Sequence, residues 1–148
     1  MDKQKRIIGI TCSTFDLLHA GHIIMLEECK KYCDYLICAL QVDPSTDRPD
    51  KNRPIQSLVE RYIQLDAVSH VDKIIPYNNE DELETIFSSL DLDVRIIGEE
   101  YKDKNFTAKN TCQKRGIKLV YNKRDHDFST SSLRERIFIQ ESNKRFVK

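Results

Sequence analysis

Two histidines near the start of the chain have the type and spacing of a phosphate-binding pair. His19 and His22 flank Gly21 in residues 14–22, which read TFDLLHAGH. If the chain is already helical here, residues three apart share a face, and the two imidazoles could donate to adjacent oxygens of one anion. Gly21 lacks a Cβ, so a ligand can approach the backbone. This pattern predicts a site for a phosphorylated ligand.

A second polar cluster lies in residues 122–132, which read NKRDHDFSTSS. Ser129 and Thr130 precede an apolar pattern typical of a helix, so either residue could cap that helix. Hydroxyls and free N–H groups at a helix N-terminus could hold the β- and γ-phosphates of a nucleotide, with Arg124 as a bidentate clamp. The alternative is a capped helix behind a solvated turn.

Two carboxylates lie close to these clusters. Glu99 follows an apolar run and could accept a hydrogen bond from a nucleotide amino group or a ribose hydroxyl. Asp16 lies in the turn before His19, where it could reach a Mg²⁺ ion or cap its own helix. The sequence leaves both roles of Asp16 open.

The elements that must position these side chains alternate along the chain. An apolar strand over residues 7–10 is followed by a turn at residues 13–16 and by helical spacing from Ile23. Further strands are predicted at residues 35–42, 71–77, 94–97 and 117–121, and helices at residues 55–69, 78–90, 107–115 and from 129 or 130 to about 141. The alternation predicts an α/β fold with one five-stranded parallel sheet and helices on both faces. Ligands bind beyond the carboxyl ends of such strands, where these clusters lie.

Composition excludes several classes of partner. The 148 residues include 24 basic and 24 acidic side chains, so zero net charge disfavours nucleic acid and anionic membranes. No apolar run approaches the roughly 20 residues that span a bilayer, and the start of the chain does not suit a signal peptide. Five cysteines without a CxxC pair suit a reducing compartment. We expect one soluble, cytoplasmic domain over residues 1–148, with a frayed tail at 142–148.

The two polar clusters also resemble motifs of a known family. Residues 14–22 are similar to the HxGH motif of the nucleotidyltransferase superfamily, in the cytidylyltransferase form and most closely that of the glycerol-3-phosphate cytidylyltransferases. Residues 124–131 resemble the second family motif, RTxGxSTT. The resemblance implies a single Rossmann-like domain that transfers CMP from CTP to a phosphorylated small alcohol or polyol and releases pyrophosphate. It also implies Mg²⁺ as cofactor and a homodimer.

The resemblance assigns roles to particular residues. It implies that His19, His22 and Arg124 are catalytic and that Asp16 contacts the metal. The residues implied to bind the nucleotide are Thr14, Phe15, Gly21, Glu99, Ser129 and Thr130, and those implied to bind substrate phosphates are Lys51, Arg53 and Arg61. Residue chemistry agrees with this reading, because attack at an α-phosphorus requires two anions to be positioned and neutralised. Exposed basic loop residues are otherwise simply solvated.

Two alternatives belong with this reading. An adenylyltransferase that uses ATP on a sugar phosphate or a related acceptor shares the HxGH motif, and residues 51–54, KNRP, resemble those of such relatives. A non-catalytic nucleotide-binding module is the second alternative, because Ser13 and Asp127 stand where the family has glycine and Asp125 stands where it commonly has threonine.

Overall fold

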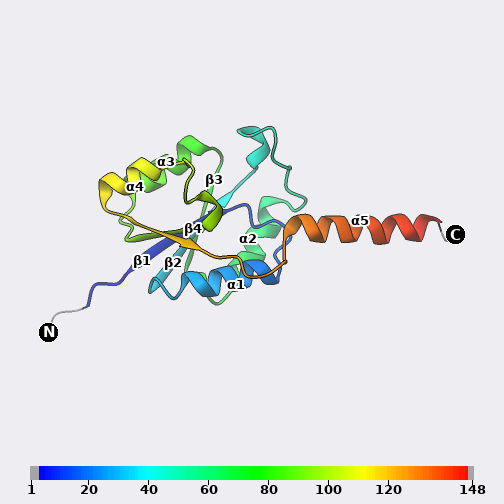
Figure 1. Cartoon of the computed structure of the whole chain (residues 1–148), viewed down its shortest axis with the longest axis horizontal. Helices are drawn as coiled ribbons and strands as arrows, with labels where there is room; N and C mark the ends of the chain where they lie inside the picture. The colour runs from blue at the N-terminus through cyan, green and yellow to red at the C-terminus, as the bar shows by residue number, and fades with distance from the viewer. Residues whose placement is uncertain (1–3, 147–148) are drawn as a thin grey trace.

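A five-stranded parallel sheet forms the centre of the computed structural model, which describes residues 4–146 (Figure 1). Its strands run in the order β3-β2-β1-β4-β5, and all neighbours are parallel, as predicted. The strands are β1 (Ile8–Ser13), β2 (Tyr35–Gln41), β3 (Lys73–Tyr77), β4 (Val94–Gly98) and β5 (Lys118–Asn122). The strand that leads into the histidine motif is therefore the central one.

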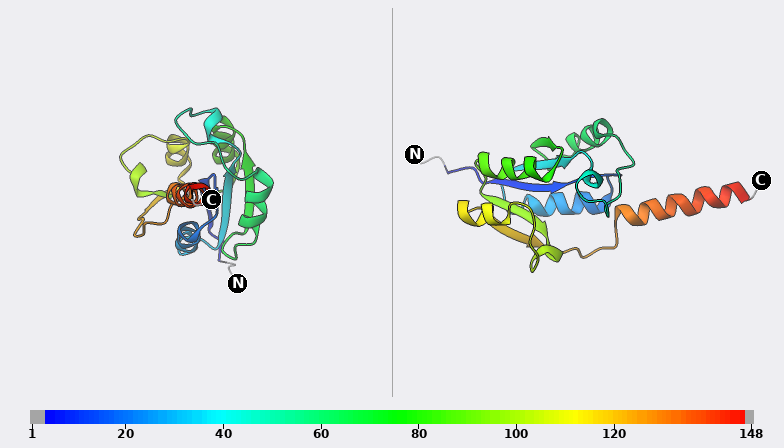
Figure 2. Two further views of the ribbon diagram at one scale, coloured as in Figure 1. Left: turned by 90° about the vertical axis from the view of Figure 1, so that its right-hand side faces the viewer. Right: turned by 90° about the horizontal axis from the view of Figure 1, so that it is seen from above.

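Helices cover both faces of the sheet, which confirms the predicted layers (Figures 1 and 2). On one face, α1 (Ala20–Cys29) and α2 (Leu58–Asp66) bury Leu26 and Leu65 against the strands. On the other, α3 (Glu80–Ser89) and α4 (Lys109–Arg115) bury Phe87 and Cys112. Two short 3-10 helices, η1 (Pro44–Thr46) and η2 (Glu99–Tyr101), follow β2 and β4.

Local sequence signals set the helix boundaries. Ser57 and Glu60 form a capping box, so α2 begins at Leu58 rather than at the predicted residue 55. The Asn79 side chain accepts from the Glu82 N–H and caps α3. Gly116 ends α4 with φ of 70°, a left-handed conformation that glycine adopts without strain.

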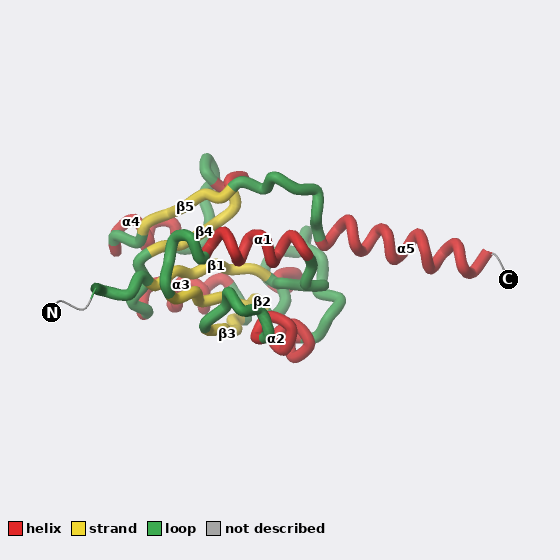
Figure 3. Tube along the Cα trace, turned by 90° about the horizontal axis from the view of Figure 1, so that it is seen from below, coloured by secondary structure: helices red, strands yellow, loops and turns green. Residues whose placement is uncertain are grey.

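The last helix, α5 (Thr130–Phe146), projects away from the sheet at its carboxyl edge (Figures 1 to 3). None of its described residues is buried. The prediction that this helix ends near residue 141 is wrong, because α5 continues to Phe146. The fraying of residues 142–148 stays a prediction, and residues 147–148 lie outside the described part. Lys144 and Arg145 suit the negative end of the helix dipole, and Lys144 Nζ lies 2.9 Å from Glu141 Oε1.

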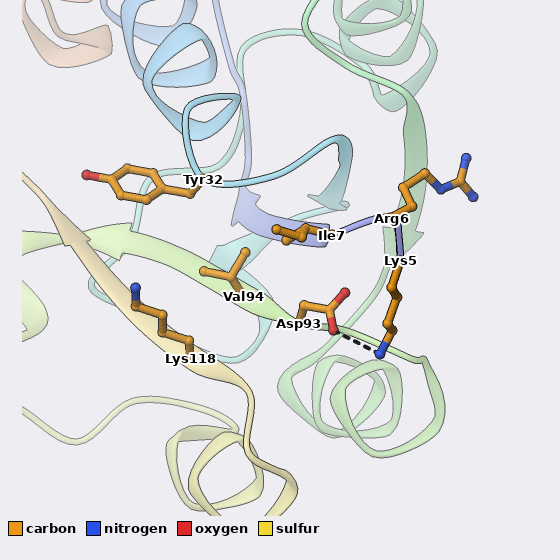
Figure 4. A pocket seen from close by; sticks show the side chains of 7 residues that line it. All are labelled: Lys5, Arg6, Ile7, Tyr32, Asp93, Val94 and Lys118. Carbon is orange, nitrogen blue, oxygen red and sulfur yellow. Dashed lines mark ion pairs between the residues drawn. The ribbon is translucent and has the colours of Figure 1, made fainter. Parts of the chain in front are cut away.

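Two other features of the described residues complete the fold. No helix within residues 4–146 has the length and apolar composition needed to cross a bilayer. A cavity of about 270 Å³ lies at the amino ends of β1, β4 and β5, the sheet edge opposite α5 (Figure 4). Val94 and Ile7 line it together with Lys118 and the Lys5–Asp93 ion pair of 3.4 Å.

Candidate active site

A larger pocket, about 810 Å³ in volume, opens at the carboxyl edge of the sheet. Its walls come from the end of β1, the start of α1, the segment after β4 and the segment that joins β5 to α5. Six of the residues predicted from sequence line it: His19, Gly21, His22, Arg124, Ser129 and Thr130. The fold thus brings together two clusters that lie more than a hundred residues apart in the sequence.

His19 and His22 begin α1 as a reciprocal cap rather than as two residues on one helical face. His19 is the N-cap, with extended backbone, and its Nδ1 accepts from the Gly21 N–H at 3.0 Å. The Nδ1 of His22 accepts from the His19 N–H at 3.2 Å, and the ring centroids are 3.9 Å apart. Because a neutral imidazole that accepts at Nδ1 carries its hydrogen on Nε2, each ring keeps one N–H donor free of the backbone.

The electrostatics of the pocket keep both rings neutral near pH 7. Burial lowers the pKa of His19, and the nearby His126 and Arg124 lower it further. Burial is also the main reason that the pKa of His22 falls from 6.5 to about 3, and His19 and Arg124 add to the effect. Asp16 raises the pKa of His22, but this effect is smaller than the lowering caused by burial. Both imidazoles are therefore uncharged hydrogen-bond donors.

The start of α5 holds His19 in place. The Thr130 hydroxyl donates to the Asp16 carbonyl at 3.1 Å, so its oxygen accepts from His19 Nε2–H at 3.3 Å. Ser129 Oγ accepts from the Ser132 N–H at 3.0 Å, which confirms the predicted cap of the last helix. Thr130 is thus a positioning residue for His19 in this structure.

Asp16 holds the backbone of the next loop instead of facing the pocket. Its side chain is buried, with Oδ2 accepting from the Ile55 N–H at 2.8 Å and Oδ1 from the Gln56 N–H at 2.9 Å. The proposed contact with Mg²⁺ does not agree with this geometry, because both carboxylate oxygens already bind backbone donors. Asp16 also does not cap α1, since His19 does.

Arg61 likewise does not reach the pocket. It is only 2% exposed, and its guanidinium donates to the carbonyls of Thr14 (3.0 Å), Gln41 (2.6 Å), Val42 (2.6 Å) and Gln56 (3.2 Å). A buried cation needs hydrogen-bond acceptors, and these four carbonyls supply them. Arg61 therefore does not make the expected phosphate contact in this structure. It instead connects three chain segments through their carbonyls.

The turn between β1 and α1 is strained, and the contacts of Asp16 and Arg61 explain why it persists. Phe15 and Leu17 have φ of 52° and 50°, a left-handed conformation that costs a bulky residue about 1–3 kcal/mol. The Leu17 N–H donates to Gln56 Oε1 at 2.8 Å. Phe15 is 1% exposed and packs in the core, so Thr14 and Phe15 shape the turn and do not line the pocket as nucleotide ligands.

Three other predicted residues lie outside the pocket lining. Lys51 and Arg53 are exposed on the loop after β2, where the Arg53 carbonyl accepts from Arg134 at 3.5 Å. Glu99 begins η2 and is not part of the lining, whereas the adjacent Glu100 is. Sequence spacing could not distinguish these two neighbours, because a 3-10 turn follows the strand directly.

Several lining residues were not assigned from sequence. Tyr101 and Tyr121 both line the pocket. His126 also lines it, and the only signal for that role was its position within the second motif.

This pocket and sheet define a class: an α/β protein with a histidine-lined pocket at the carboxyl edge of a parallel sheet, the edge where ligands bind in such folds. A family model described as cytidylyltransferase-like matches residues 10–136, and the chain belongs to that family. Glycerol-3-phosphate cytidylyltransferase of Bacillus subtilis (strain 168) is 32% identical over 128 residues, which cover 86% of this chain and 95% of that protein.

Other relatives share the domain within different proteins. Bifunctional protein HldE of Campylobacter jejuni (strain RM1221) is 34% identical over 135 residues, covering 90% of this chain but only 28% of that protein. The crystal structure of the lipopolysaccharide core biosynthesis protein from Thermoplasma volcanium GSS1 has a TM-score of 0.65 and 24% identity, covering 84% of this chain and 100% of that one. This likeness shows the Rossmann-like fold.

Proposed function

We propose that this protein transfers CMP from CTP to a phosphorylated small alcohol or polyol, similar to glycerol-3-phosphate, and releases pyrophosphate. Support comes from the family and from the match to a glycerol-3-phosphate cytidylyltransferase over 95% of that protein's length. The observation that carries the proposal is the histidine pair at the start of α1, whose Nδ1 atoms accept from backbone N–H groups so that both rings keep an Nε2–H donor in one pocket.

The reaction requires the protein to position the two substrates and to stabilise the negative charge that develops. A phosphate oxygen of the acceptor attacks the α-phosphorus, and the bond from that phosphorus to the leaving pyrophosphate breaks. Negative charge grows on the oxygens around phosphorus, where His19 and His22 donate and Arg124 adds positive charge. No side-chain nucleophile is required, because the acceptor oxygen is already anionic.

Mg²⁺ belongs to this proposal as a cofactor that enters with the triphosphate. Within residues 4–146 no group of three or more His, Cys, Asp or Glu side chains is arranged to hold a metal ion. Mg²⁺ in such sites is bound by one or two carboxylates and by substrate phosphates. Glu100 is a carboxylate of the pocket lining that suits this role, and the ion would neutralise phosphate charge.

Pyrophosphate release tests the proposal directly. The full chain is assayed with Mg²⁺ and either CTP or ATP against glycerol-3-phosphate, ribitol-5-phosphate, phosphocholine, phosphoethanolamine and heptose-1-phosphate. Release with CTP and a polyol phosphate is expected, and removal of Mg²⁺ with EDTA should abolish it. Release with ATP alone would identify an adenylyltransferase instead. No release with any pair would contradict the proposed transfer and favour a nucleotide-binding module.

We also propose that the protein acts as a cytoplasmic homodimer. On α2, Val59 and Ile63 are 66% and 64% exposed, and on α5 Ile137 and Phe138 are 53% and 72% exposed. Two such apolar surfaces on one chain could cover each other reciprocally in a two-fold dimer. The five free cysteines suit a reducing compartment.

A further inference from the structure

Three of the four histidines of this chain line one pocket. His126 joins His19 and His22 there, and it comes from the segment between β5 and α5. The fourth, His70, lies between α2 and β3 and is not part of the lining. The roles given above to the histidine pair leave His126 without a function.

His126 has the same hydrogen-bond pattern as the other two rings. Its Nδ1 accepts from the Phe128 N–H at 3.1 Å, so the neutral ring carries its hydrogen on Nε2. The ring also stacks on Phe128, with centroids 5.3 Å apart and planes inclined by 30°. In all three histidines a local backbone N–H therefore fixes the tautomer that leaves Nε2–H as a donor.

The three rings meet at the start of α1. A Cβ placed on Gly21 would lie 2.8 Å from the Cε1 atom of His126 and 2.8 Å from that of His19, so both rings pack directly against this glycine. His126 also contributes to the lowered pKa of His19, which requires the two rings to be close in space. The site at the helix N-terminus is thus lined by imidazole from two segments distant in the sequence.

We propose that His126 is a third phosphate-binding residue, which donates its Nε2–H to the phosphate chain of the nucleotide and to pyrophosphate. This inference rests on the nucleotidyl transfer proposed above. A metal site is excluded by the tautomers, because coordination through the three Nε2 atoms would require each hydrogen to move to an Nδ1 that already accepts from the backbone. A core-packing role does not fit, because the ring is only partly buried and its partner Phe128 is 50% exposed.

Binding of inorganic pyrophosphate, measured by calorimetry with the full chain, tests this role. His126→Ala should weaken binding about tenfold, as expected for loss of a hydrogen bond to a charged group. His126→Gln should retain most of the affinity, because its amide N–H can replace Nε2–H. His70→Ala is the matched control and should bind like the wild type, whereas His19→Ala should also weaken binding.

The outcomes separate this inference from the proposed function. Wild-type affinity in His126→Ala, with turnover of CTP intact in the wild type, would overturn the inference alone. Equal losses in the Ala and Gln variants would also overturn it, since they would show that the ring and not its donor matters. A wild-type protein that neither binds pyrophosphate nor releases it from any nucleotide would overturn both. Thermal unfolding of each variant checks that the fold is retained.

Discussion

At the scale of single residues, the site depends on which nitrogen of each imidazole is free. The backbone N–H groups of His19 and Gly21 bind the Nδ1 atoms of His22 and His19, so no side chain outside the motif is needed to select the tautomer. Burial then keeps the rings neutral. A neutral N–H donor that is already oriented can stabilise developing phosphate charge without reorganisation.

Removal of either ring should therefore affect turnover more than stability. His19→Ala and His22→Ala should each fold and lose about two or more orders of magnitude in kcat, as removal of a transition-state donor does. His70→Ala should keep the wild-type rate. Steady-state kinetics of pyrophosphate release measures all three, and near-wild-type turnover in either pocket variant would show that the site is assigned wrongly.

The low pKa of His22 also predicts how stability changes with pH. His22 has a pKa of about 3 when folded, against an ordinary value of 6.5. Between these values the unfolded chain binds a proton that the folded chain does not, so the free energy of unfolding decreases as pH falls through this range. One such proton corresponds to about 1.4 kcal/mol per pH unit. Urea denaturation from pH 7 to pH 4 should show a smaller slope for His22→Gln than for the wild type; equal slopes would contradict this assignment.

The sequence predicted the residues whose role follows from local chemistry and missed those whose role depends on tertiary contacts. His19, Gly21 and Ser129 lie at helix starts that the sequence itself defines. Arg61 was expected to bind a substrate phosphate, as the family resemblance implies, but its side chain is buried. Its partners are backbone carbonyls from separate segments. Every residue has a carbonyl, so the sequence does not indicate which of them will bind a side chain.

At the scale of elements, the turn between β1 and α1 is the part most dependent on support from elsewhere. Its left-handed residues are held by the Gln56 side chain, from the loop before α2, and by the buried Arg61. The predicted order of strands and helices agreed with the structure because apolar periodicity acts locally. The unusual conformation of Phe15 was not predictable, since bulky residues disfavour positive φ.

Substitution of Arg61 tests this support. Arg61→Met should lower the free energy of unfolding by about 2–4 kcal/mol, because it leaves several carbonyls buried without donors. Turnover should fall as well, since the turn positions His19. The matched control is Lys114→Met, an exposed cation on α4. Urea denaturation gives the stabilities, and a phosphate-binding role for Arg61 would instead lower turnover with unchanged stability.

At the scale of the whole molecule, α5 is unusual because it packs little against the rest of its own chain. Its described residues are all at least partly exposed, and Phe138 is 72% exposed. Helices of this length gain most of their stability from packing. A second copy of the chain would provide that packing, in agreement with the apolar surface on α2.

Light scattering with size-exclusion chromatography tests the dimer. The wild type should have the mass of two chains, and Phe138→Glu or Ile63→Glu should shift it toward one, because a buried charge disfavours association. Gln140→Glu adds the same charge at another exposed position of α5 and serves as the control. A monomeric wild type at micromolar concentration would contradict the proposed dimer.

The contact between Thr130 and Asp16 joins residues 114 positions apart, and this separation has a consequence for how the protein is made. Closing so long a loop is among the slower steps of folding, because chain entropy opposes it until other contacts are present. We therefore expect the strand pairings of the sheet to form before the contact between Thr130 and Asp16. Nucleotide that binds both sides of the pocket will favour the fully folded chain by mass action. A substrate that contacts both walls of the pocket would thereby hold the segments around Asp16 and Thr130 together.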